Sequence, residues 1–104
     1  MDTGLHKTLR MGFDEALLRV PVALKGEGFG VLTEIDVKST LKQKLGVDTH
    51  RYSILGACNP PFAHQALQID LEAGLMMPCN VAVYEADDGV VHVAAGADGV
   101  FEAH

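Results

Sequence analysis

The chain has 104 residues, 48% of them hydrophobic, which is enough for one domain with a hydrophobic core but too little for two. Its 8 Lys and Arg residues against 14 Asp and Glu residues give a net charge of −6, without a basic run. We therefore expect no nucleic-acid partner. No apolar stretch approaches the ~20 residues of a membrane-spanning helix, and the N-terminus lacks the regions of a signal peptide. The sequence predicts a single domain over residues 1–104, located in the cytoplasm, with no membrane partner.

The first part of the chain predicts a strand, a helix and a second strand. Thr3 to Met11 alternates loosely between apolar and polar residues, as a half-exposed strand does. Apolar residues at helical spacing predict a helix from Phe13 to Lys25. Pro21 lies inside it and removes a backbone hydrogen bond, so we expect a kink or a break there. Phe29 to Ile35 is rich in β-branched and aromatic residues and predicts a strand whose odd-numbered residues share one face.

The middle of the chain predicts a short helix, a third strand and another helix. Asp36 is placed to cap the short helix, and Gly46 follows its last apolar residue. An apolar strand is predicted from Tyr52 to Cys58. Asn59 can then cap the next helix, and Pro60 suits its first position because the missing N–H is not needed there.

The last predicted elements are the two strands of a β-hairpin, around a tight turn at Asp88-Gly89. The order of elements predicts an α+β fold: a two-layer sandwich of a mixed, mostly antiparallel sheet with helices on one face. The tail over residues 96–104 is expected to be irregular. The strands have more apolar positions than the helices can cover, so we expect a homodimer that hides the remainder. Val83 and Val91 are candidate contact residues for such a dimer.

Two cysteines are the main candidates for a functional site. Cys58 precedes a predicted helix start, where free backbone N–H groups stabilise a thiolate, so it is a candidate catalytic nucleophile. The alternative for Cys58 and Cys79 is burial as small apolar residues, which is common for free cysteine. In the cytoplasm they are expected to be reduced. The 20 residues between them leave open whether the fold brings the two thiols together.

Four further residues complete the candidate site. His64 lies one helical turn into the helix after Cys58 and could pair with that thiol, or hold a metal with both cysteines. The alternative is a histidine on a helix surface. Glu34, near a strand end, could project towards the same site. Asn59 and Asn80, each next to a cysteine, complete the candidate ligand-binding set. No glycine-rich phosphate loop or metalloprotease signature is present, so no cofactor is predicted by name.

Four blocks of the sequence resemble one known family. In chain order they are Gly28–Val37, Leu41–Gly46, Tyr52–Pro60 and Leu75–Val81. Over about Leu5 to Val93 the chain resembles the domain of unknown function 302 family. The resemblance implies a small α+β domain from bacteria or archaea, typically dimeric, with no established activity and no agreed catalytic residues. Members with cysteines are similar at Cys58 and Cys79. The chain departs from the family pattern at Pro21, and its tail from Gly96 to His104 lacks the usual C-terminal helix.

These observations leave three functions open. The favoured hypothesis is a non-enzymatic, dimeric domain that binds a small molecule or a metal near Cys58, Asn59 and Cys79. The second is a thiol-dependent redox or stress-response enzyme that uses Cys58. The third is an interaction module with no small-molecule site. The sequence alone does not decide whether the protein is an enzyme.

Overall fold

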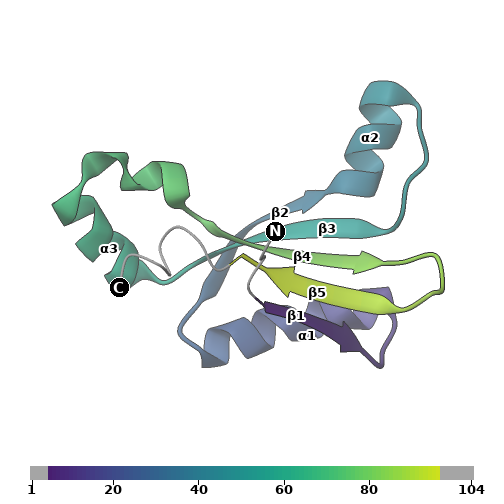
Figure 1. Cartoon of the computed structure of the whole chain (residues 1–104), viewed down its shortest axis with the longest axis horizontal. Coiled ribbons are helices and arrows are strands. Elements are labelled where there is room, and N and C mark those ends of the chain that lie inside the picture. Colours follow the sequence, from purple (N-terminus) through teal and green to yellow (C-terminus); the bar gives the residue numbers. More distant parts are fainter. Residues whose placement is uncertain (1–4, 97–104) are drawn as a thin grey trace.

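The computed structural model describes residues 5–96 and shows how the predicted elements assemble (Figure 1). In chain order they are β1 (Leu5–Leu9), α1 (Phe13–Gly26), β2 (Gly30–Asp36), α2 (Val37–Leu45), β3 (Tyr52–Cys58), α3 (Pro60–Ile69), the 3-10 helix η1 (Leu71–Met76), β4 (Cys79–Glu85) and β5 (Val91–Ala95). The sheet has the strand order β1-β5-β4-β3-β2 and is antiparallel at every pairing. The predicted α+β two-layer fold is therefore confirmed. No described helix combines the length and the apolar character needed to cross a membrane.

Two of the sequence expectations lie at least partly outside the described residues. The first two residues of the strand predicted from Thr3 precede residue 5, and nearly all of the predicted tail follows residue 96.

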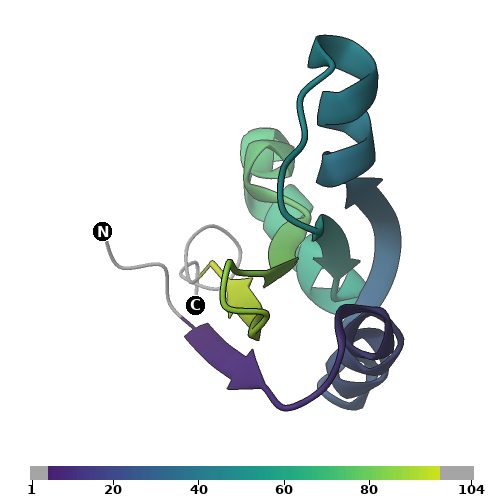
Figure 2. The ribbon, with the colours of Figure 1, turned by 90° about the vertical axis from the view of Figure 1, so that its right-hand side faces the viewer.

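One face of the sheet carries the hydrophobic core. Side chains alternate between the two faces along each strand, so the buried residues of β3, β4 and β5 point to the same side. There they pack against Phe13 and Ala16 of α1. The buried strand residues are Leu55, Val81, Val83 and Val91. Figure 2 shows α1 on this side of the sheet, which we call the covered face.

The opposite side of the sheet, which we call the open face, has no helix of residues 5–96 packed along it in this way. By the pairing register, its side chains come from the residues of β3, β4 and β5 that alternate with the core residues. These are Tyr52, Ile54, Ala82, Tyr84, His92 and Ala94. All six are only half-buried in the single chain. Helix α2 and the α3–η1 segment extend beyond opposite ends of the strands (Figure 1).

Helix α1 continues through Pro21, so the expected break is absent. Proline removes one hydrogen bond from the helix, but the turn that follows is held in place by the packing of Leu24 against the core. The helix also ends in a well-formed cap. Gly28 adopts the left-handed conformation with φ 88°, and its N–H donates to the Lys25 carbonyl at 3.1 Å. The N–H of Phe29 donates to the Leu24 carbonyl at 2.9 Å, which completes a Schellman motif.

A β-bulge at Leu32 changes the face of the sheet to which successive side chains of β2 point. Val31 pairs with Ala57, whereas Thr33 pairs with Gly56 on the other side of the bulge. Because adjacent residues of β3 point to opposite faces, Val31 lies on the covered face and Thr33 on the open face. The prediction that the odd-numbered residues of this strand share one face was therefore wrong.

The bulged region leads to a prediction about Gly56. A Cβ atom there would overlap the Thr33 hydroxyl and lie 3.0 Å from Pro78 Cγ. We expect Gly56→Ala to lower the free energy of unfolding by about 1–3 kcal/mol, as overpacking does in other cores. Gly30→Ala, on the neighbouring strand, is the control, because nothing lies within 4 Å of its Cβ position. Urea denaturation compares the two variants. Equal midpoints for both would contradict the proposed overlap.

Candidate functional site

The two cysteines lie on neighbouring strands but on opposite faces of the sheet. Cys79 pairs with Ala57, whose side chain is buried on the covered face. Cys58 is the next residue of β3 and therefore points to the open face. Both cysteines are half-buried, and neither forms a disulfide. A disulfide between them would require backbone movement, because their Cβ atoms point apart. The sequence left open whether the fold brings the two thiols together, and the structure places them on opposite faces.

Asn59 caps α3 as the sequence predicts. Its Oδ1 accepts a hydrogen bond from the Phe62 N–H at 3.2 Å, and Pro60 occupies the first helical position. The amide nitrogen of the same side chain lies beside the end of α1: a Cβ atom on Gly28 would be 3.3 Å from Nδ2. Asn59 thus connects the start of α3 with the turn that ends α1.

The other predicted site residues are divided between α3 and the two faces of the sheet, where Asn80 shares the open face with Cys58 and Glu34 the covered face with Cys79. His64 is exposed on α3. Glu34 pairs with Leu55 on the covered face, whereas Asn80 pairs with Gly56 on the open face. Within residues 5–96 no three His, Cys, Asp or Glu side chains are placed to hold a metal ion. The candidate metal ligands Cys58, Cys79 and His64 are therefore not brought together.

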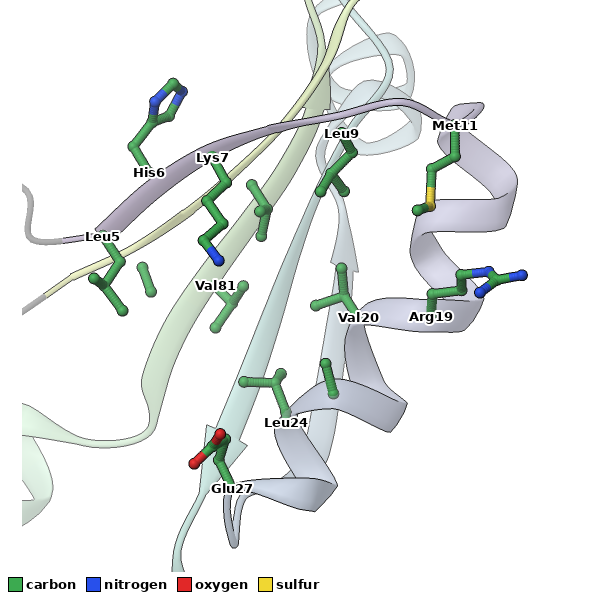
Figure 3. Close-up of a pocket in the computed structure, with 13 residues that line it drawn as sticks. Leu5, His6, Lys7, Leu9, Met11, Arg19, Val20, Leu24, Glu27 and Val81 are labelled. Carbon is green, nitrogen blue, oxygen red and sulfur yellow. The ribbon is translucent and has the colours of Figure 1, made fainter.

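A groove between β1 and α1 is a site that sequence reasoning missed (Figure 3). It has a volume of about 440 Å³ and is open to solvent. Its lining is mainly aliphatic and comes from both walls and from the floor between them. The main apolar residues are Leu5, Leu9, Val20, Leu24, Val81 and Val93.

The path of α1 across the sheet creates this groove. The helix packs mainly against β2 and β4 rather than against β1. Its first turn is buried through Phe13 and Ala16, whereas Val20 and Leu24 further along are only half-buried. Strand β1 is at the edge of the sheet, so a hollow remains between it and the second half of the helix. Sequence periodicity places these residues on the correct faces but does not give the crossing path of the helix.

Three charged side chains lie at the mouth of the groove. Lys7 comes from β1 and Arg19 from α1, and Glu27 directly follows the last residue of α1 (Figure 3). The Arg19 Nε donates to Glu15 Oε2 at 2.9 Å along the helix surface. The alternation in the sequence already placed Lys7 in the same row as Leu5 and Leu9. This alternation is the sequence pattern that could have predicted Lys7 as the cationic residue of the groove.

A row of four rings crosses the open face. His6, His92, Tyr84 and Tyr52 come from β1, β5, β4 and β3 in that order, and neighbouring ring centroids are 5.1, 4.9 and 5.2 Å apart. The His6 Nε2 and His92 Nδ1 atoms are 3.0 Å apart and share a hydrogen bond. These side chains give the open face a mixed aromatic and polar surface.

An antiparallel five-stranded sheet with one helix packed across it defines a small α+β domain, and the comparisons identify its family. Residues 5–97 match the family described as Domain of unknown function DUF302, and the chain belongs to it. A similar solved structure is that of the uncharacterized conserved protein DUF302 from Bacillus stearothermophilus. It is 32% identical, has a TM-score of 0.80, and the match covers 88% of this chain and 71% of that chain. None of the curated proteins matches.

The cap on α3 leads to a prediction about Asn59. Asn59→Ala removes the oxygen that accepts the Phe62 N–H, which costs a helix about 0.5–2 kcal/mol. We expect hydrogen-exchange protection of the α3 amides to fall by the matching factor of about 2 to 30. Asn59→Asp keeps an acceptor oxygen and is the control. An equal loss of protection in both variants would mean that the Asn59 amide group beside Gly28 matters more than the cap. Unchanged protection in Asn59→Ala would contradict the contribution of the cap.

Proposed function

We propose that the protein is a dimeric domain that binds a small apolar molecule in the groove between β1 and α1. The observation that supports this function is the groove itself. Its volume of about 440 Å³ is within the usual range for ligand sites, and its lining is apolar with a few polar groups at the mouth. The floor residue Val81 is only 3% exposed, so a molecule on it would be removed from water on one side.

The groove is better supported as a site than the region around Cys58. The thiols of Cys58 and Cys79 are on opposite faces, so one small ligand or metal would not contact both without a change in the sheet. The groove, in contrast, is one continuous surface from two elements. A thiol enzyme would have to depend on Cys58 alone.

Filling the groove tests its role in binding. Ala23 lines the groove, whereas the neighbouring Val22 is 71% exposed and does not. The probe is N-phenyl-1-naphthylamine, a neutral dye whose fluorescence rises in apolar surroundings. We expect Ala23→Phe to weaken probe binding by about tenfold or more, because burial of one large apolar group contributes about 1.5–3 kcal/mol. Val22→Phe adds a ring outside the groove and should leave the affinity unchanged.

Equal affinities in the two variants and the unmodified protein would place the dye elsewhere and contradict the groove as the binding site. Circular dichroism checks that both variants keep their helices. Ala23 is itself exposed, so a larger side chain there does not have to enter the core.

Apolar side chains on the open face and at its ends could provide the contacts of this dimer. Ile35 is 51% exposed at one edge of the open face. Ile69, Leu71 and Leu75 of the α3–η1 segment are each 85% exposed. A second copy is the partner that fits, because the same surface is present on each subunit and a two-fold axis pairs it with itself. Val83 and Val91 are not available for this contact, since both are buried under α1; the expectation for these two residues was wrong.

A charge on the open face should prevent dimer formation. We expect static light scattering at micromolar concentration to give twice the monomer mass of 11.1 kDa. Ile54→Lys places an ammonium group at the centre of the open face and should give the monomer with unchanged circular dichroism. Leu18→Lys is the control, because Leu18 is 74% exposed on α1, away from this face. A monomeric unmodified protein, or dissociation caused only by Leu18→Lys, would refute this interface.

A further inference from the structure

Lys7 interrupts the apolar row that β1 presents to α1. Residues two apart in a strand point to the same face, so Lys7 lies between Leu5 and Leu9 and its side chain hangs over the groove (Figure 3). Its partner across the ladder is Val93. In the part of the chain that the structure describes, no acidic side chain forms an ion pair with Lys7. The groove therefore has a positive charge directly above an apolar floor.

The charges along the groove are uneven. Arg19 lies on the opposite wall, but its side chain points away from Lys7 (Figure 3), and its Nε donates to Glu15. Glu27 is at the far end, next to the C-terminus of α1, where the helix dipole is also negative. An anionic group is thus favoured near Lys7 and disfavoured near Glu27.

We infer that the groove binds an amphipathic anion, a chain-like carboxylate whose acid group pairs with Lys7 while its hydrocarbon part lies on the apolar floor. This inference rests on the proposed function, because the groove must first bind apolar molecules. The volume of about 440 Å³ is large enough for such a chain, and the polar groups at its mouth are few. Lys7 sets the position of the head group, and the aliphatic side chains contact the tail.

A purely structural role for Lys7 makes a different prediction. Strand β1 is at the edge of the sheet, and a charge on an edge strand prevents unwanted pairing with another chain. In that case loss of the charge would increase aggregation and leave the preference among ligands unchanged. The two roles are therefore separable by a binding measurement.

The experiment measures how well three ten-carbon compounds, decanoate, decanol and decylamine, displace N-phenyl-1-naphthylamine from the full chain. Lys7→Met removes the charge but keeps an unbranched side chain. This variant should lower the affinity for decanoate by about 2- to 5-fold, the range for an exposed ion pair, and leave the affinity for decanol unchanged. Lys7→Glu should lower the affinity for decanoate further and raise the affinity for decylamine. Lys25→Met is the matched control, because Lys25 is an exposed lysine of α1 outside the groove; it should behave as the unmodified protein.

The outcomes separate this inference from the proposed function. An equal loss of affinity for decanol and decanoate in Lys7→Met would overturn the inference, because Lys7 would then act by packing alone. Aggregation with unchanged ligand preference would also overturn it, in favour of protection of the edge strand. In both cases binding in the groove still stands, as shown by the effect of Ala23→Phe. If none of the three compounds displaces the dye and Ala23→Phe has no effect, the proposed function fails and the inference fails with it.

Discussion

The packing of α1 on one face of the sheet is the contact on which the rest of the structure depends. Phe13 and Ala16 fill the space above Leu55 and Val83, and these side chains are almost completely buried. Among the described residues the core is small, so a single helix holds most of it. The path of that helix also determines what it leaves uncovered. Strand β1 faces an open groove on the same side, and none of the described helices packs along the opposite face of the sheet.

Local sequence signals predicted the elements well because they act over a few residues. The caps at Asp36 and Asn59 and the glycine ends of α1 and α2 depend only on neighbouring backbone groups, and the structure forms them where expected. The expectation that Gly74 ends the helix after Asn59 was wrong, because α3 ends at Ile69 and Gly74 lies within η1. The hairpin and the mostly antiparallel sheet follow from the order and spacing of strands. Pro21 was an exception. The helix continues through it because Val20 and Leu24 on either side pack against the core, and this packing was not visible in the sequence.

The candidate site was harder to predict because it depends on register. A shift of one residue moves every side chain of a strand to the other face. Cys58 and Cys79 are near each other along adjacent strands, yet their positions in the pairing differ by one residue and place them on opposite sides. The bulge at Leu32 has the same effect within β2. Predicting the groove also requires the path of α1 across the sheet, and this path depends on contacts between residues that are distant in the sequence.

The contact between Gly28 and Asn59 limits how the chain can change during evolution. The positive φ of Gly28 is accessible to glycine and, at a cost, to asparagine or aspartate. The Asn59 amide, 3.3 Å from the Cβ position, leaves little room even for these. A larger residue at position 28 is compatible only with a smaller one at position 59, and that smaller residue would have to remain a helix cap. Serine or glycine meets both conditions. Positions 28 and 59 should therefore vary together among relatives, although 30 residues separate them in the chain.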